Sequence, residues 1–233
     1  MVRVKLRKGI CTVTVLSHQT YDLKTLTCQE LLRIIKKNFM YLIKSGCNIS
    51  GLKHVLSQYL DSDRTVDYYC LNDLLTLMEN KPDMTLHEVE MQPLFWSPRK
   101  RISFVQQVHE TNQNPNEQRM HNAMRDIQKR KYEVLGCADW VKEIRKVECM
   151  HIIEKQFSLG KYKAQEISDL FRYMRNVFGH FSKHQTAFKS LRPIPNTLID
   201  VFFKTFPKLL LEMVTAVRTA YGKRFDTDFL ACL

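Results

Sequence analysis

Four residues whose side chains could together cleave RNA without a metal ion lie close to one another in this chain: Tyr162, Arg175, Asn176 and His180. Such cleavage occurs when the 2′-hydroxyl of RNA attacks the adjacent phosphorus. It needs a base at that hydroxyl, an acid at the leaving 5′-oxygen and a cation on the phosphoryl oxygens. Histidine can donate a proton near neutral pH, arginine binds phosphoryl oxygens through its fork of N–H donors, and asparagine adds a neutral donor. A tyrosine hydroxyl is a weak base unless neighbouring cations favour its ionised form, and this tyrosine has a lysine on either side.

The segment 168–181 has the spacing of an amphipathic helix. On a helical wheel its apolar residues share one side, and the other side carries Asp169, Arg172, Arg175, Asn176 and His180. Asn176 and His180 are one turn apart, so their side chains are neighbours, and Gly179 leaves the adjoining space open. Tyr162 precedes this helix in a loop, from which it could fold back over the polar side.

A plainer interpretation of the same residues is open. Asn176 and His180 could cap the helix, Arg175 could pair with Asp169, and Tyr162 could anchor the loop. The apolar side of the helix is expected to be core and not a cofactor pocket.

The positive charge of the chain is concentrated in its later part. The net charge is +12, and residues 1–93 hold 12 Lys and Arg against 10 Asp and Glu, while residues 94–233 hold 24 against 14. Such clustering favours a polyanionic partner, most often nucleic acid or an acidic membrane surface. The alternative is a basic, solvated surface without a partner.

Hydropathy and cysteine usage narrow the class of protein. No apolar run approaches the roughly 18 residues of a membrane span, and the first residues lack the features of a signal peptide. The seven cysteines are scattered, with no C-x-x-C pair. We therefore expect free thiols in a reducing compartment, a cytoplasmic location, and no metal site or cofactor.

Residues 1–93 combine a strand-like beginning with helical spacing. Residues 2–16 alternate like strands, with Gly9 as a break. Helices are expected from Thr27 to Gly46, over 52–59, over 66–78 and over 86–91, the third ending before Pro82. The aromatic turn 93–98 is the expected domain boundary.

Residues 94–233 are expected to be entirely helical apart from loops. The predicted helices span 100–109, 120–131, 139 to about 157, 168–181 and 198–221, the last being the longest, and 111–117 is a polar loop. The chain is therefore predicted to be mainly α, with domains at 1–93 and 94–233.

Four segments of the second domain resemble one known family. They are Phe95-Trp96-Ser97-Pro98 with the helix after it, Asp139-Trp140-x-x-x-Ile144, Asp169 to Asn176, and Phe202 to Leu210. In this order they resemble the ribonuclease extension, or KEN domain, of the inositol-requiring stress-sensor kinase and of RNase L, over about residues 94–230. The Arg-x-x-x-x-His spacing is also similar to that of the wider HEPN group of helical ribonucleases.

The resemblance implies roles for the four residues above. His180 falls on the family's general acid and Tyr162 on the tyrosine that activates the 2′-hydroxyl. Arg175 and Asn176 fall on the pair that stabilises the phosphate. Asp169 and Trp140 match residues that support the site. Three basic residues beside the site are expected to bind RNA: Arg172, Lys161 and Lys163.

Residues 1–93 resemble only part of a kinase. Residues 38–46 and 73–96 look like late helices of a kinase C-lobe, but the Gly-rich loop, the Val-Ala-Ile-Lys motif and the Asp-Phe-Gly motif are missing. We therefore expect a degenerate, mostly helical C-lobe-like segment without kinase activity. In the family the nucleotide-loaded kinase half promotes the dimer, so here activation would come from self-association, a partner or upstream sequence.

The resulting expectation is a metal-independent endoribonuclease that leaves 2′,3′-cyclic phosphate and 5′-hydroxyl ends. RNA is the expected substrate, and a homodimer or a heterodimer with a full-length relative is the expected assembly. The alternative is a non-catalytic, RNA-binding and dimerising regulatory module of the same family.

Overall fold

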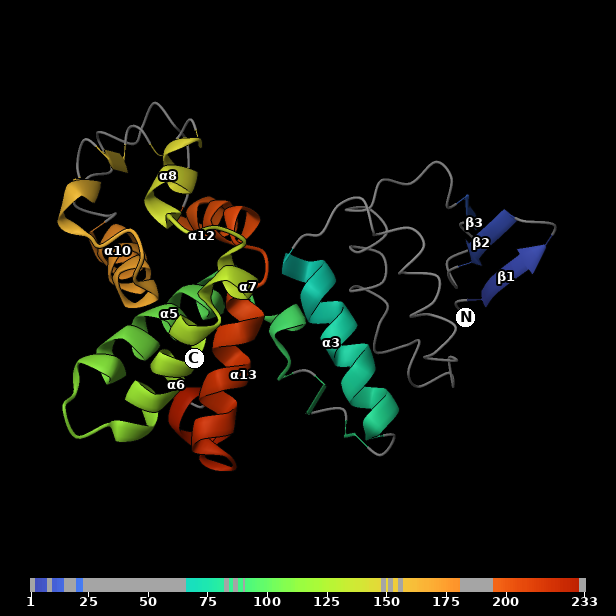
Figure 1. Cartoon of the computed structure of the whole chain (residues 1–233). Helices are drawn as coiled ribbons and strands as arrows, with labels where there is room; N and C mark the ends of the chain where they lie inside the picture. The colour runs from blue at the N-terminus through green and yellow to red at the C-terminus, as the bar shows by residue number, and fades with distance from the viewer. Residues whose placement is uncertain are drawn as a thin grey trace. The chain divides into compact units, whose positions relative to one another are not determined.

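The computed structural model describes residues 3–7, 10–14, 20–22, 66–81, 84–85, 88–89, 91–147, 150, 153–154, 157–180 and 195–230. The chain divides into two compact units, Met1–Phe95 and Trp96–Leu233 (Figure 1). This division falls close to the boundary expected after residue 93.

The first unit contains a small antiparallel sheet and a helix. Its strands β1 (Arg3–Arg7), β2 (Ile10–Thr14) and β3 (Thr20–Asp22) pair in that order. The first two form a hairpin in which Arg7 faces Ile10, so the strands predicted on either side of Gly9 are confirmed. The sequence did not predict β3.

Helix α3 (Val66–Asn80) confirms the helix expected over 66–78. It buries Cys70, Leu71, Leu74, Leu75 and Met78, and it ends before Pro82, as a helix must where a proline cannot continue the hydrogen-bond ladder. The 3-10 helix η1 (Pro93–Phe95) follows. The helices expected over 27–46 and 52–59 lie outside the described residues. Of the helix expected over 86–91, residues 88–89 are helical, 91 is in a turn, and 86, 87 and 90 lie outside the described residues.

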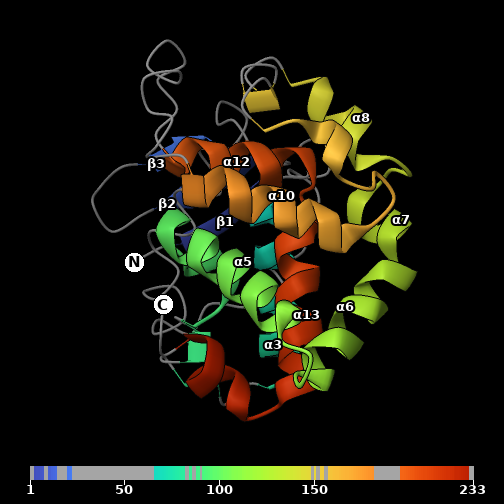
Figure 2. The same ribbon diagram turned by 90° about the vertical axis from the view of Figure 1, so that its left-hand side faces the viewer.

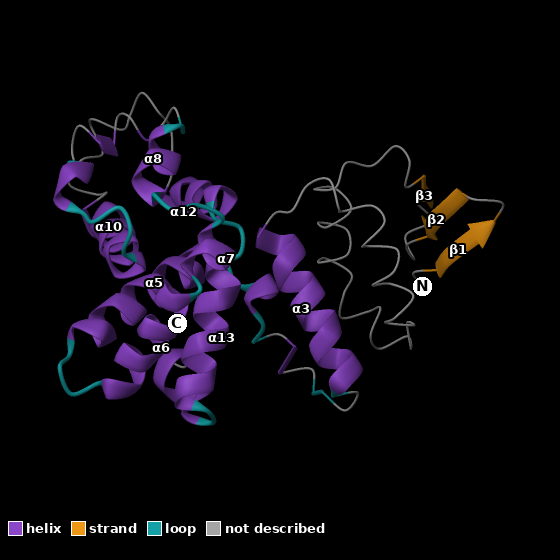
Figure 3. Cartoon of the chain, in the orientation of Figure 1, coloured by secondary structure: helices purple, strands orange, loops and turns teal. Residues whose placement is uncertain are grey.

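Every regular element described in the second unit is a helix (Figure 3), so the mainly α prediction is confirmed. The elements are α5 (Pro98–Gln113), α6 (Gln118–Lys129), α7 (Lys131–Leu135), α8 (Trp140–Arg145), η2 (Leu159–Lys161), α10 (Ile167–His180), α12 (Pro195–Thr205), α13 (Leu209–Tyr221) and the π-helical turn η4 (Asp226–Leu230).

Side-chain caps define where two of these helices begin. The Ser97 hydroxyl accepts a hydrogen bond from the Lys100 amide at 3.2 Å, and Pro98 occupies the first helical position, where no amide is needed. The Asp139 carboxylate accepts from the Lys142 amide at 2.9 Å and starts α8. Both caps lie in segments that carry the family resemblance.

The prediction of one long helix over 198–221 is wrong. The structure has two helices, α12 ending at Thr205 and α13 beginning at Leu209. Pro207 lies between them, and it has no amide to donate and would collide with the carbonyl four residues earlier if the helix continued. The last regular bond before the break runs from the Phe206 amide to the Phe202 carbonyl at 2.8 Å.

Two other expected boundaries are also wrong. The helix expected from Asp139 to about 157 ends at Arg145, whose side chain then pairs with Glu154 at 2.7 Å. The expected loop 111–117 is shorter because α5 continues to Gln113. Asn114 ends that helix, and its side chain accepts from the Asn116 amide at 3.1 Å in a tight turn.

The core of the second unit holds α10 rigidly between other helices. Helix α10 lies between α5 and α12 (Figure 2). The rings of Tyr173 and Phe178 contact Phe202 of α12, with centroids 6.0 and 5.7 Å apart. The apolar side of α10 is buried, as its spacing predicted: Ile167, Leu170, Phe171, Met174, Val177 and Phe178. No helix in the described part of the chain is long and apolar enough to cross a bilayer.

Candidate active site

Helix α10 and the turn before it bring Tyr162 and Asn176 into contact. Tyr162 follows the 3-10 helix η2 in an extended conformation, which returns the chain along the polar side of α10. There the Asn176 side-chain amide donates a hydrogen bond from Nδ2 to the Tyr162 hydroxyl at 2.9 Å. Two residues fourteen positions apart in the chain therefore form one polar unit.

Arg175 extends this unit by one hydrogen bond. Its Nη1 atom donates to Oδ1 of Asn176 at 3.1 Å. Because a guanidinium can only donate, it fixes the asparagine oxygen towards itself and turns the amide nitrogen towards Tyr162. Asn176 thus bonds two side chains and does not serve as the helix cap considered above.

The positive charge of Arg175 is available to a ligand. Among the described residues Arg175 makes no ion pair, and the carboxylate that could have paired with it, Asp169, binds Arg172 instead. The alternative pairing of Arg175 with Asp169 is therefore wrong. A half-buried guanidinium without a carboxylate is suited to an anionic group such as a phosphodiester.

His180 is the last residue of α10, one turn beyond Asn176. Its ring stacks on Phe157, with centroids 6.2 Å apart and planes inclined by 26°. In the described part of the chain no hydrogen bond reaches its ring nitrogens, and a Cβ at Gly179 would meet nothing within 4 Å. The imidazole is therefore oriented by a ring contact, and no hydrogen bond from the described residues occupies its nitrogens.

Asp169 does not lie on the open polar side where the helical wheel placed it. Its side chain is buried, with 9% of the residue exposed. One carboxylate oxygen accepts from the Lys163 amide at 2.6 Å, and the other lies 3.4 Å from a guanidinium nitrogen of Arg172. These partners compensate the charge, which explains how it can turn inward. The carboxylate consequently fixes the backbone directly after Tyr162.

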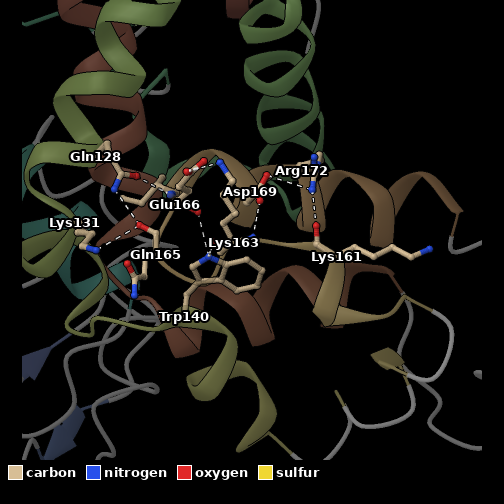
Figure 4. Close-up of polar contacts among 10 residues, drawn as sticks. Gln128, Lys131, Trp140, Lys161, Lys163, Gln165, Glu166, Asp169 and Arg172 are labelled. Atoms are coloured by element: carbon tan, nitrogen blue, oxygen red, sulfur yellow. Dashed lines mark hydrogen bonds and ion pairs between the residues drawn. The ribbon is translucent and has the colours of Figure 1, made fainter.

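Trp140 holds the same segment from α8 (Figure 4). The fully buried indole donates from Nε1 to the carbonyls of Lys163 at 3.2 Å and Glu166 at 3.1 Å, and the Trp140 amide donates to the Ala164 carbonyl at 3.2 Å. Its ring also meets the Tyr162 ring edge-on at 6.2 Å. We call residues 162–166 the tyrosine loop, and Trp140 is its main support on this side.

Arg172 of α10 contacts the tyrosine loop and the residue before it. It donates to the Lys161 carbonyl at 3.0 Å, and its guanidinium carbon lies 4.8 Å from the centre of the Tyr162 ring, a cation–π contact. Lys163 is exposed and pairs with Glu166 at 2.9 Å, which raises the pKa of the Lys163 ammonium. Lys161 makes no ion pair among the described residues, and its side chain extends away from the loop (Figure 4).

The sequence did not reveal two neighbours of this site. Gln128 of α6 donates to the Gln165 carbonyl at 3.0 Å and accepts from the Ile167 amide at 2.8 Å, so it ties the loop to the start of α10. Tyr173 meets the Tyr162 ring edge-on at 5.2 Å. Gln128 lies 37 and 39 positions before its two partners, Gln165 and Ile167. No local sequence pattern predicts a hydrogen bond between residues so far apart.

His109 is a third residue that the sequence did not single out. It lies on α5, which packs against α10, and only 9% of it is exposed. Burial, followed by the positive charges of Arg175 and Arg172, lowers the pKa of His109. The one available signal was its position on the buried side of α5, next to Val108.

No group of three or more histidine, cysteine, aspartate or glutamate side chains in the described ranges is arranged to hold a metal ion. The polar groups of the site are thus an arginine, an amide, a phenol and an imidazole. These are groups that bind a phosphate and move protons.

Comparison with known families places the second unit in a family. The family model of ribonuclease 2-5A matches residues 101–229, more than half of the chain, including all the residues named for the site above. The chain belongs to the ribonuclease 2-5A family. The resemblance to the KEN domain is thereby confirmed.

Curated relatives of this family member are similar over much of its length. The serine/threonine-protein kinase/endoribonuclease ire-1 of Caenorhabditis elegans is 26% identical over 214 residues, covering 82% of this chain and 21% of the relative. The protein IRE1a of Arabidopsis thaliana, of the same description, is 23% identical over 227 residues, with shares of 87% and 26%. IRE2 of Homo sapiens is 26% identical over 144 residues, covering 60% of this chain and 14% of the relative.

The chain is much shorter than these relatives. It spans about a quarter or less of their length. The first two matches cover more of the chain than the second unit holds, so they extend into the first unit.

Proposed function

We propose that this ribonuclease 2-5A family member is an endoribonuclease that cleaves single-stranded or loop RNA by transesterification. The products would be a 2′,3′-cyclic phosphate and a 5′-hydroxyl. The observation that carries the proposal is the hydrogen-bonded series Arg175–Asn176–Tyr162, with His180, whose ring nitrogens have no hydrogen-bond partner among the described residues, one turn away on the same helix. The names of the relatives, which include "endoribonuclease", support it.

In the proposed reaction the RNA 2′-oxygen attacks phosphorus and the bond from phosphorus to the 5′-oxygen breaks. Tyr162, acting as a phenolate whose oxygen accepts a hydrogen bond from Asn176, takes up the proton of the 2′-hydroxyl and becomes a neutral phenol. Arg175 binds the phosphoryl oxygens, on which negative charge grows in the transition state. His180 donates a proton to the departing 5′-oxygen.

Charge in the second unit supports an RNA substrate. Residues 94–233 carry the larger excess of Lys and Arg, and Arg175 and Lys161 of the site have no carboxylate partner among the described residues. Cations of this kind bind phosphates and release the counterions condensed on RNA. Lys161, Lys163 and Arg172 are the proposed flanking contacts, with Arg172 also acting as a clamp on Tyr162.

Residues 1–93 are proposed to be a C-lobe-like segment without kinase activity, because they lack the nucleotide-handling motifs of kinases. A switch driven by a bound nucleotide is therefore not expected in this chain. Self-association of the second unit, or pairing with a full-length relative, is the proposed activator. Cleavage rates that rise more steeply than linearly with protein concentration would support this.

A second candidate is a non-catalytic RNA-binding and dimerising module. It is favoured by the absence of kinase motifs from residues 1–93, which leaves regulation of a partner as a possible role. It predicts RNA binding without turnover and co-purification with a full-length relative.

The test is cleavage of a stem-loop RNA in EDTA by wild type, His180→Ala and Tyr162→Phe, with His121→Gln as a matched histidine control. The His121 ring contacts the Asn112 carbonyl, outside the site. We expect both site variants to be at least about 100-fold slower than wild type, and the control to match wild type. Mass spectrometry should find cyclic phosphate ends. Equal rates in all variants, or no cleavage by concentrated wild type, would contradict the proposal.

A further inference from the structure

Tyr132 is an exposed aromatic ring beside the proposed site. With 61% of its surface accessible, it is the one exposed large hydrophobic residue among the described residues. It lies on α7, a short helix that starts directly after α6. Its neighbours Val134 and Leu135 are buried and anchor the helix, so the ring is presented to solvent from a fixed element.

The ring is accompanied by positive charge. The Lys131 ammonium lies 5.0 Å from the centre of the Tyr132 ring. Lys131 and the exposed Lys129 make no ion pair within the described ranges, whereas Arg130 between them is paired with Glu212 at 2.6 Å. Glu133 follows Tyr132, and no ion pair joins it to either lysine in the described part of the chain. The surface therefore offers an aromatic ring and, next to it, the ammonium of Lys131, which pairs with no carboxylate among the described residues.

Lys131 also joins this surface to the tyrosine loop. The same ammonium donates to the Gln165 carbonyl at 3.4 Å, an oxygen that Gln128 contacts as well (Figure 4). Gln165 is three residues after Tyr162, which limits the separation of their Cα atoms to about 11 Å. The Lys131 ammonium therefore lies against the loop that begins with Tyr162.

We propose that Tyr132 stacks on an unpaired base of the RNA, outside the cleaved pair of nucleotides, while Lys131 binds the phosphate that leads from this base to the site. The proposal rests on the proposed function, since it takes RNA as the ligand. Stacking on an aromatic ring tolerates any base, so the subsite would add affinity and would require a single-stranded nucleotide at one position.

A protein partner fits this surface less well. A stable protein interface buries about 800 Å² on each side and has a continuous apolar centre. Tyr132 is instead a single ring among lysines, and an aromatic residue interleaved with cations is the usual design of a single-stranded nucleic-acid surface.

The experiment compares wild type, Tyr132→Phe, Tyr132→Ser and Lys131→Gln in binding a labelled RNA of about 12 nucleotides, long enough for such sites. The RNA is 2′-O-methylated throughout, so it cannot be cleaved. Tyr132→Phe keeps the ring and should bind as wild type, and Tyr132→Ser should bind about tenfold more weakly. Lys131→Gln should reduce the slope of log Kd against log salt by about one.

A second measurement separates stacking from a general effect on the surface. Abasic sites are placed one at a time along the same RNA. In wild type one position should cost about tenfold in affinity, and in Tyr132→Ser that position should cost nothing further. Unchanged binding by Tyr132→Ser, or an equal loss at every position, would overturn the proposal.

Two controls show whether a negative result concerns the Tyr132 subsite, self-association or the proposed function. Sedimentation of wild type and Tyr132→Ser without RNA should give the same mass; a lower mass for the variant would assign Tyr132 to self-association and overturn the proposal. The stem-loop cleavage assay is independent of this subsite. Tyr132-dependent binding without cleavage would remove the proposed function and keep the subsite, while cleavage with Tyr132-independent binding would do the reverse.

Discussion

At the scale of single residues, Asn176 determines how the site is oriented. It accepts from Arg175 and donates to Tyr162, so it is the one group through which the cation and the phenol are coupled. A side chain in this place must have both an acceptor and a donor, on a short planar group. Among the natural residues of this size only asparagine has both.

Replacing Asn176 with aspartate should therefore reduce cleavage while leaving the fold intact. The carboxylate would still accept from Arg175, but it could not donate to Tyr162 and it would repel the phosphate. Removing one preorganised donor typically costs about 100- to 1,000-fold in kcat. Single-turnover cleavage of the stem-loop RNA measures the loss, and an unchanged melting temperature shows that it is not caused by unfolding. Wild-type rates in Asn176→Asp would refute the coupling.

The residues of α10 itself could be assigned to the site from the sequence, and its long-range neighbours could not. Helical spacing predicted that Arg175, Asn176 and His180 share one side. It could not predict that Asp169 turns inward, because that depends on a backbone amide six residues earlier in a loop. Gln128 and His109 reach the site from other helices, and no local pattern specifies which helices will be neighbours.

At the scale of elements, short connections position the site more than the long helices do. The tyrosine loop is bound by Trp140 on one side and by Gln128 on the other. Both supports depend on the chain between them, where Gly136 caps the end of α7 and Asp139 caps the start of α8. Gly136 has φ 70°, in the left-handed region that glycine adopts without strain.

Two glycine replacements should consequently have opposite effects on stability. Gly136→Ala should lower the free energy of unfolding by about 1 kcal/mol, because alanine is strained at this φ although no atom lies within 4 Å of the new Cβ. Gly179→Ala should raise it by up to about 1 kcal/mol, since this glycine lies within α10 in equally open space. Urea unfolding followed by tryptophan fluorescence measures both. The same sign for the two changes would contradict this account.

The elements themselves were partly predictable for the same physical reasons. Alternation and Gly9 gave the hairpin of β1 and β2, and apolar spacing gave α3 and α10. The spacing of 198–221 also fits one helix, because two helices that bury their sides in the same core keep similar patterns. What separates them is the covalent constraint of Pro207, which interrupts a helix whatever the periodicity of its neighbours.

At the scale of the whole molecule, the chemistry and the excess charge lie in the same unit. Both tryptophans of the chain, Trp96 and Trp140, are also buried there. Tryptophan fluorescence therefore reports unfolding of the second unit alone. This makes the pH dependence of that unit measurable without a contribution from the first.

The second unit should lose stability below about pH 6.5, the pKa of an ordinary histidine. Burial and the charges of Arg175 and Arg172 lower the pKa of His109 in the folded protein, with partial compensation from Glu110 and Asp169. The unfolded chain then binds a proton at this residue at a higher pH than the folded chain does. Stability consequently falls as the pH drops through this range, and the loss stops growing below the folded-state pKa.

Thermal unfolding at pH 7.5 and pH 5.5, followed by tryptophan fluorescence, measures this loss. Wild type should melt at a lower temperature at pH 5.5, and His109→Gln should show a smaller difference between the two values, because glutamine has no proton to gain. His121→Gln should retain the wild-type difference, since it leaves His109 in place. If His109→Gln and wild type lose the same amount between these pH values, burial of the neutral imidazole beside the two arginines is not a source of the acid sensitivity.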